Sequence, residues 1–281
     1  MRALVTGGAG FVGSHLVDAL VARGDDVTYV DALVGGTVHH NPGATFVHAD
    51  ILNWPHSLIG FDAVFHLAAS KATVCMADPE RDLRTNALGT LRLATMAARA
   101  GATFVHASTG SVAAAASYYA ISKGAGEQYV RLVGELEGMP WTALRYYHVI
   151  GARQSDDQDI GGVVPIFLRR ASLGLALMVH GTGAQVRSFT SVHDVVRATL
   201  LVADKPQRAV LDCASGIRVS IRELAEFIAA DHGLAILSGP RRPWDVDEFF
   251  PNSDRLRELG IDFDTDWRRL IRAMGVGQVA A

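Results

Sequence analysis

Cysteine is nearly absent from this sequence, which has only two among its 281 residues, Cys75 and Cys213, without CxxC spacing. A disulfide framework and a cysteine-based zinc site are therefore not expected, and a reducing compartment fits. No apolar run approaches the roughly 18 residues needed to cross a bilayer, and the N-terminal pattern does not predict a secretory leader. We expect a cytoplasmic protein with no membrane partner and no metal.

An excess of charge of either sign is also missing, since 26 Lys and Arg residues face 29 Asp and Glu residues, a formal net charge of −3. This balance argues against a nucleic-acid partner. Hydrophobic residues make up 49% of the chain and charged residues 20%, which favours a packed core over disorder. At roughly 150 residues per domain, the length predicts about two domains, or one large domain with an appendage.

Short apolar runs alternate with helical patterns through the first half of the chain. We expect strands at residues 2–6, 26–30, 45–48, 63–67, 103–107 and 142–146, and helices at 13–23, 83–100 and 118–134. Such alternation is typical of a parallel sheet with right-handed crossovers. The sequence therefore predicts an α/β fold, a Rossmann-type doubly wound parallel sheet over residues 1–150.

The pattern becomes less regular after about residue 150. We expect helices at residues 164–173, 192–203 and 220–232, strands at 176–180 and 209–213, and weaker helices near 253–259 and 267–273. No long linker separates this part from the first. We therefore expect residues 151–281 to form a smaller C-terminal α/β substrate lobe that exchanges some chain with the sheet domain.

A glycine-rich loop joins the first expected strand to the first helix. Gly7 permits the tight turn, Gly10 lets a pyrophosphate approach the backbone, and Gly13 allows close packing of helix on strand. Asp31 lies 18 residues beyond Gly13, at the end of the second strand, where a carboxylate binds a ribose 2′-hydroxyl and repels a 2′-phosphate. These features favour NAD over NADP, with Asp50 placed to accept from the adenine amino group.

Tyr119 and Lys123 are four residues apart in an expected helix, so their side chains share one face. An ammonium group beside a phenol lowers the phenol pKa, which makes the tyrosine a usable base near neutral pH. We expect Tyr119 to act as acid and base, with Lys123 tuning it and holding the nicotinamide ribose. Thr109 is expected to bond the reacting oxygen, while Ser108 and Ser111 also fit a plain strand-end turn.

Several segments together resemble the extended short-chain dehydrogenases/reductases, specifically the NAD-dependent nucleotide-sugar epimerase/dehydratase family, and within it the UDP-sugar 4-epimerases. They are TGGAGFVG at 6–13, FHLAA at 65–69, NALGT at 86–90, SYYAISK at 117–123, LRYY at 144–147, GTGAQVRSFTSVHDV at 181–195 and RPWDV at 242–246. The resemblance runs nearly end to end. It implies a nucleotide-diphosphate sugar as substrate and NAD as cofactor.

The resemblance also implies which residues form the site. The cofactor-binding residues would be Gly7, Gly10, Phe11, Val12, Asp31, Asp50, Ile51, Leu67, Ala68, Ala69, Lys71, Asn86, Tyr119 and Lys123. The substrate-binding residues would be Lys71, Ser111, His148, Val164, Arg187, Arg242 and Asp245. Within that set, Arg187 and Arg242 would clamp the diphosphate.

The implied reaction is a transient oxidation, usually at sugar C4, in which the tyrosine takes the hydroxyl proton. The 4-keto sugar is then reduced on its opposite face, or loses water or CO₂. At the end of this strand, the family's dehydratases have a pattern like Thr-Asp-Glu and its decarboxylases a pattern like Thr-Ser-Glu. This chain has Thr109, Gly110 and Ser111 instead. The pattern favours a 4-epimerase for a UDP- or TDP-hexose or uronic acid, and Lys71 is similar to a galactose-type epimerase lysine. A dehydratase, decarboxylase or reductase is the alternative.

This chain departs from the family pattern in three places. His148 replaces the usual Asn, residues 112–117 form a very short loop, and Ser188 replaces the usual Asp. His148 is either a changed substrate contact or a site of altered chemistry. The helices at 83–100 and 118–134 either build a four-helix homodimer interface, which we expect, or only pack on the sheet. A cofactor-sensing protein without turnover would lack the Tyr–Lys pair.

Overall fold

Seven parallel strands form one sheet at the centre of the computed structural model, which describes residues 1–281 except 36–37, 55–56, 71, 158–160, 243–244 and 278–281. The strand order is β11-β6-β5-β4-β1-β2-β3. The strands are β1 (Arg2–Thr6), β2 (Asp26–Asp31), β3 (Thr45–His48), β4 (Ala63–His66), β5 (Thr103–Thr109), β6 (Trp141–Tyr146) and β11 (Val210–Cys213). This sheet confirms the predicted doubly wound α/β fold, and the strand order reverses direction at β1, where such folds bind ligands.

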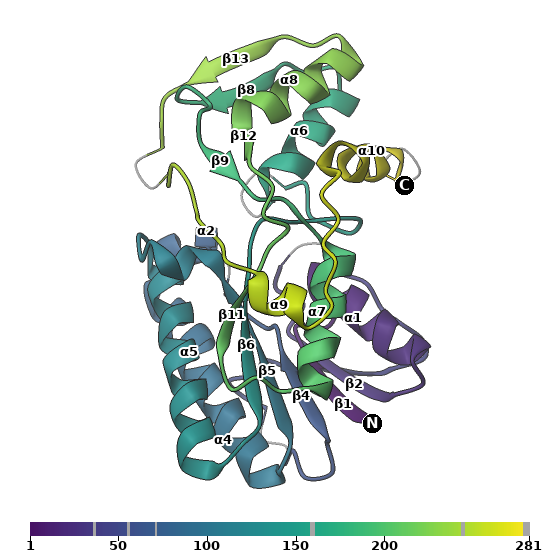
Figure 1. Ribbon diagram of the computed structural model, residues 1–281, viewed down its shortest axis with the longest axis vertical. Coiled ribbons are helices and arrows are strands. Elements are labelled where there is room, and N and C mark those ends of the chain that lie inside the picture. Colours follow the sequence, from purple (N-terminus) through teal and green to yellow (C-terminus); the bar gives the residue numbers. More distant parts are fainter. Residues whose placement is uncertain (36–37, 55–56, 71, 158–160, 243–244, 278–281) are drawn as a thin grey trace.

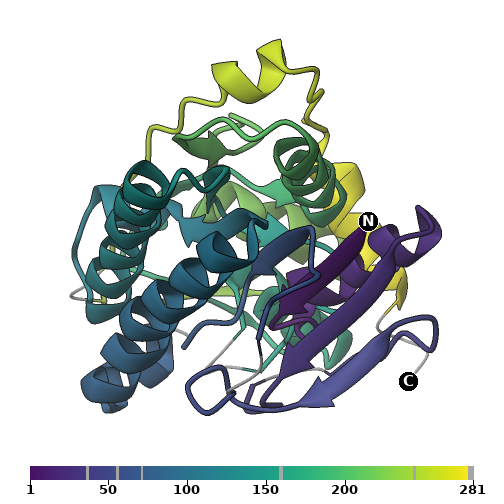
Figure 2. The ribbon, with the colours of Figure 1, turned by 90° about the horizontal axis from the view of Figure 1, so that it is seen from below.

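Helices cover both faces of the sheet (Figure 1). Helices α1 (Phe11–Ala22) and α7 (Val192–Asp204) lie on one face, and α4 (Thr90–Ala100) and α5 (Tyr118–Glu137) lie together on the other, as the view from below shows (Figure 2). Successive side chains of β1 point to opposite faces, so Val5 packs with the first pair of helices and Leu4 with the second. The sheet is thus buried on both faces, as a parallel sheet requires.

The segment between β4 and α4 is broken into short turns of helix. It contains α2 (Ala72–Ala77), α3 (Pro79–Asp82) and the π-helix η1 (Leu83–Gly89) before α4 begins. The predicted helix over residues 83–100 is present, and its first part, η1, is π-helical rather than α-helical. A π turn inside a helix is uncommon and often lies at a functional site.

The second lobe has its own apolar core. Helices α6 (Val163–Ser172), α8 (Ile221–His232) and α10 (Trp267–Gly277) enclose strands β8 (Leu177–His180) and β13 (Ile236–Gly239), which pair in parallel. Strand β13 was not predicted. Two further small sheets pair β7 (Val149–Ile150) with β10 (Thr190–Ser191), and β9 (Val186–Arg187) with β12 (Val219–Ser220).

The chain crosses between the two lobes more than once. Strand β11 and helix α7 follow residue 150 in sequence but belong to the seven-stranded sheet and its helical layer, and α9 (Asp254–Glu258) packs near β11. The domain boundary at residue 150 stays a prediction. Within the residues that the structure describes, no helix combines the length and the apolar character needed to cross a bilayer. The cytoplasmic location also stays a prediction.

Candidate active site

A pocket of about 400 Å³ lies at the carboxyl ends of β1, β2 and β4. It brings together most of the predicted cofactor residues. Those that line it are Gly7, Gly10, Phe11, Val12, Asp31, Asp50, Ile51, Leu67, Ala68, Ala69 and Tyr119. The residues are distant in sequence, yet the parallel strands end at one edge of the sheet and bring them together.

The glycine loop of this pocket has no room for side chains. Gly7 has φ +71°, and a Cβ there would lie 2.7 Å from the backbone nitrogen of Ala68. A Cβ on Gly13 would lie 2.0 Å from the carbonyl oxygen of Gly7. Helix α1 begins after Gly10 without a side-chain cap, so its first N–H groups can bind a phosphate. This cradle fits a dinucleotide.

Asp31 is held in place by the backbone around it. Its two carboxylate oxygens accept the N–H groups of Ala9 at 3.1 Å and Leu33 at 2.8 Å. Each oxygen keeps a further lone pair with which it can accept a ribose hydroxyl. Asp50 is oriented in the same way, because its carboxylate accepts the N–H of Leu52 at 2.9 Å.

Two of the described residues that were predicted to bind the cofactor, Asn86 and Lys123, do not line this pocket. Asn86 is fully buried and Lys123 is 1% exposed, so both lie behind its wall. Lys71 lies outside the described residues. The pocket is also lined by residues that were not predicted, among them Arg81, Thr85, Gln154 and Ser155. They lie outside the motifs quoted above, so only the tertiary structure could identify them.

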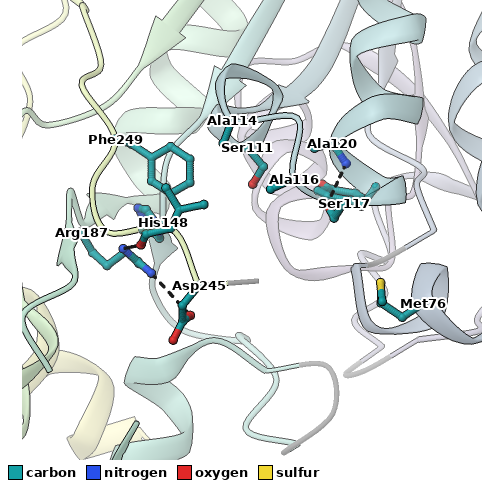
Figure 3. Close-up of a pocket in the computed structure, with 12 residues that line it drawn as sticks. Met76, Ser111, Ala114, Ala116, Ser117, Ala120, His148, Arg187, Asp245 and Phe249 are labelled. Atoms are coloured by element: carbon teal, nitrogen blue, oxygen red, sulfur yellow. Dashed lines mark hydrogen bonds and ion pairs between the residues drawn. The ribbon is translucent and has the colours of Figure 1, made fainter. Parts of the chain in front are cut away.

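A second pocket, of about 470 Å³, lies between the two lobes and adjoins the first (Figure 3). Ser111, Ser117 and Ala120 come from the sheet domain, whereas Arg187 and Asp245 come from the substrate lobe. Tyr119 lines both pockets. This tyrosine therefore stands where the two pockets meet.

Tyr119 stands in the first turn of α5, which begins after Ser117, whose hydroxyl accepts the N–H of Ala120 at 3.2 Å. Thr109, the last residue of β5, hydrogen-bonds the Tyr119 hydroxyl through its side chain. This bond places Thr109 where a group orienting the reacting oxygen should be. Ser111 is linked to Thr109 by hydroxyl contact at 3.3 Å.

Burial controls the protonation of the Tyr–Lys pair. It raises the pKa of Tyr119 to about 12, although the hydrogen bond from Thr109 opposes the shift. Burial also lowers the pKa of Lys123 to about 8. The nearby Cys75 and Asp82 raise the phenol pKa as well, so the lowering that was expected from the lysine is not seen in this arrangement. Tyr119 holds its proton at neutral pH, and the buried carboxylates of Glu127 and Asp82 favour the charged form of Lys123.

The aromatic ring of Tyr147 fills the space in which a side chain at Gly110 would lie. A Cβ at this position would lie 2.2 Å from Cε1 of Tyr147. Tyr147 is 3% exposed, and its hydroxyl donates to the carboxylate of Asp212 at 3.2 Å. The other oxygen of Asp212 accepts the N–H of Asn252 at 2.9 Å. The ring is therefore anchored, and position 110 cannot carry a carboxylate without moving it.

His148 lines the second pocket in a backbone conformation with φ +38°. Few residues other than glycine adopt this region, but His and Asn do so more readily than most. Burial lowers the pKa of His148 to about 3, so the ring is neutral. Its Nδ1 atom is buried and has no hydrogen-bond partner among the described residues.

Arg187 is the cation at the substrate-lobe end of the pocket (Figure 3). Its guanidinium donates to the carbonyls of Val186 and Val246, both at 2.9 Å, and lies 3.9 Å from the carboxylate of Asp245. Two other predicted substrate residues lie elsewhere: Val164 is buried in the core of the lobe, and Arg242 is exposed outside the described lining of the pocket.

Comparison with known proteins agrees with this geometry. UDP-N-acetyl-alpha-D-glucosaminuronate decarboxylase of Bacillus cytotoxicus is 34% identical over 255 residues, which span 81% of this chain and 79% of the relative. UDP-glucose 4-epimerase of Thermotoga maritima, solved with UDP-glucose, superposes with a TM-score of 0.93 at 30% identity over 98% of both chains. UDP-glucose 4-epimerase of Thermus thermophilus, solved with NAD, superposes with a TM-score of 0.89 at 29% identity over 100% of both chains.

The family described as NAD dependent epimerase/dehydratase matches residues 3–213, which include the glycine loop, the Tyr–Lys pair and β11. This span is most of the chain. The resemblance expected from the motifs is confirmed, and so is the choice of NAD as cofactor. The chain is an enzyme of the NAD-dependent epimerase/dehydratase family.

Proposed function

We propose that the chain is a nucleotide-sugar 4-epimerase that acts on a UDP- or TDP-hexose or uronic acid through a transient 4-keto sugar. The observation that carries this proposal is the contact between Gly110 and Tyr147. The resembling dehydratases carry Asp at the position of Gly110 and Glu at the position of Ser111, whereas the decarboxylases carry only the Glu. The anchored ring occupies the space of the dehydratase Asp. Ser111, at the other position, carries only a hydroxyl.

Bound NAD supplies the reversible two-electron oxidation of the sugar alcohol. Tyr119 takes the proton of that alcohol and later returns it, because this residue lines both pockets. Thr109 orients the same oxygen through its bond to Tyr119. Lys123 supplies positive charge from within α5, which favours the phenolate as the proton leaves.

The diphosphate of the sugar nucleotide is proposed to lie against Arg187. Its guanidinium faces the pocket and is held by two backbone carbonyls, so it is positioned before the substrate arrives. Arginine matches the geometry of phosphate oxygens better than lysine does. Arg242 would have to approach from outside the lined pocket to share this role.

A decarboxylase is the second candidate, since a relative with 34% identity carries that name. Both reactions share the oxidation step and differ in what happens to the keto sugar. A panel of UDP- and TDP-hexoses and uronic acids, read by mass spectrometry and proton NMR, separates them. Unchanged mass with an inverted ring-proton coupling supports the epimerase, whereas loss of CO₂ or water would replace it with the second candidate.

The same panel tests the role of Tyr119. We expect Tyr119→Phe to lower kcat by roughly a thousandfold or more, because a positioned acid–base group contributes about 10²–10⁴ in rate. NAD content of the purified variant should match the wild type, since glycine-loop contacts are unchanged. Full activity of the phenylalanine variant would contradict the mechanism.

The homodimer is also a proposal, and its support is an exposed apolar stripe on α5. Tyr118, Ile121, Leu132 and Leu136 are between 44% and 75% exposed and recur at helical spacing along one side. A second copy of the same surface would bury them. Sedimentation analysis should give twice the chain mass, and a concentration-independent monomer would refute the dimer.

A further inference from the structure

The cofactor pocket has an unusual balance of charge. Among the described residues that line it, the only acidic or basic side chains apart from the phenol of Tyr119 are those of Asp31, Asp50 and Arg81. A dinucleotide brings a pyrophosphate with two negative charges into this pocket. The two carboxylates oppose that charge, so the helix N-terminus and Arg81 are what the lining offers in its favour.

Arg81 lines the cofactor pocket and is the basic side chain among its described lining residues. Its own backbone N–H is bonded to the carboxylate of Asp78 at 3.0 Å, which caps helix α3. The next arginine in the segment, Arg84, pairs with Glu80 at 3.8 Å. The side chain of Arg81 makes no such pair or hydrogen bond within the described part of the chain.

The turn that carries Arg81 is anchored from behind by a buried carboxylate. Asp82 is 2% exposed, and one of its oxygens accepts the thiol of Cys75 at 2.7 Å, the amide of Asn86 at 2.6 Å and the hydroxyl of Ser122 at 3.0 Å. Ser122 belongs to α5, next to Lys123. The backbone at residue 81 is therefore fixed against the catalytic helix.

Asn86 ties the same turn to the pocket wall. Its side chain accepts the N–H of Ser70 at 2.8 Å and donates to the carbonyl of Ser70 at 3.1 Å. Ser70 itself lines the cofactor pocket, as does Thr85, the residue before Asn86. The π-helical turn thus keeps Thr85 and Arg81 on the pocket side while Asp82 and Asn86 point into the protein.

We propose that Arg81 is a cofactor-binding residue whose guanidinium pairs with the NAD pyrophosphate across the pocket from the glycine loop. A guanidinium binds phosphate oxygens through two parallel N–H bonds, so it adds geometry as well as charge. The glycine loop then holds the pyrophosphate from one side and Arg81 from the other. The assignment concerns cofactor binding and is independent of what happens to the sugar.

The test is the affinity for NAD of the cofactor-free protein, measured by calorimetry at low and high salt. We expect Arg81→Ala to weaken NAD binding roughly ten- to hundredfold, as expected for loss of a hydrogen bond to a charged group. The salt dependence of binding should also fall, because one exposed charge pair is gone. Arg81→Lys should recover part of the affinity.

The matched control is Arg84→Ala, which removes an exposed arginine one turn away that does not line the pocket. Its NAD affinity should stay within about twofold of the wild type, since exposed pairs contribute little. Circular dichroism must show that both variants are folded. An Arg81→Ala variant that binds NAD as the wild type does, or an equal loss in the Arg84→Ala variant, would overturn the proposal.

A second arm uses NADP, which shares the pyrophosphate but adds a 2′-phosphate. If Arg81 contacts the pyrophosphate, Arg81→Ala weakens NAD and NADP binding by the same factor. A loss confined to NADP would place the guanidinium at the ribose instead and refute the assignment. Neither readout requires a sugar substrate, so failure here is distinguishable from failure of the epimerase proposal.

Discussion

The cofactor pocket and the substrate pocket are built in different ways. The cofactor pocket uses main chain and small residues at the ends of adjacent strands, such as Gly7, Gly10 and Ala68. The substrate pocket collects side chains from both lobes, including Ser117, His148 and Arg187. The first therefore depends on local backbone geometry, and the second depends on how distant segments pack.

This difference explains why one family can keep its cofactor and change its reaction. A backbone cradle tolerates almost no substitution, because any Cβ at Gly13 collides with the carbonyl of Gly7. The shape and polarity of a pocket lined by side chains change whenever one lining residue changes. His148, which stands where the family usually has Asn, is such a position. Relatives named as epimerases and decarboxylases match the chain at similar identity.

The largest effect is expected in the backbone cradle, from Gly13→Ala. Alanine normally stabilises a helix interior by about 1 kcal/mol relative to glycine. Here the added Cβ lies 2.0 Å from a carbonyl oxygen, so we expect unfolding free energy to fall by about 2 kcal/mol. Most NAD binding should also be lost. Chemical denaturation and calorimetry measure both effects.

The control for that substitution is Gly275→Ala in helix α10. A Cβ there meets only Cδ2 of Leu168, at 3.9 Å, which is ordinary contact. This variant should be as stable as the wild type or more so. If Gly13→Ala and Gly275→Ala change the unfolding free energy equally, the close approach of Gly13 to the carbonyl of Gly7 is not the reason for a glycine at position 13.

An intermediate effect is expected at the junction of the two pockets, from the charge of Lys123. Burial lowers its pKa to about 8, so the ammonium is present below that pH and lost above it. The rate should therefore fall as pH rises through about 8. Lys123→Arg keeps its charge over this range and should lack that decline, even with a lower rate. An unchanged alkaline decline in the arginine variant would assign it to another group.

The smallest effect is expected in the side-chain pocket, from His148→Asn. Asparagine also tolerates the left-handed conformation, so stability should change by less than about 1 kcal/mol. Its amide offers both donor and acceptor where the neutral imidazole leaves a free Nδ1. We expect KM for sugar nucleotides to change within about tenfold, with NAD affinity unchanged. Identical KM values across a sugar panel would remove His148 from the substrate site.

Sequence patterns predicted the elements that repeat a simple rule. All seven strands of the sheet except β11 follow the alternation of strand and helix in the first half, and β11 was expected as a strand without its place in the sheet. Strand β13 was missed because residues 236–239 are short and half exposed, without a clear alternation. The π-helical geometry of residues 83–89 was not predicted, and within it Asn86 makes buried bonds to Ser70 and Asp82, which are set by the fold.

The cofactor site was more predictable than the substrate site for the same reason. Gly7, Asp31 and Tyr119 stand in motifs whose spacing reflects local geometry, and all three line the predicted pocket. Arg81 stands outside the quoted motifs, so its place in the wall follows only from the fold. The role of each residue stays a prediction until the variants are measured.

The sequence by itself determined the α/β alternation, the glycine cradle and the Tyr–Lys face of one helix, because each arises from neighbours along the chain. Only the tertiary structure decided that the Tyr147 ring fills the space beside Gly110, that Tyr119 meets both pockets, and that burial raises the pKa of Tyr119. These features depend on segments that the sheet brings together and on the loss of water around them. The spacing of residues along the chain predicts neither the contacts nor the loss of water.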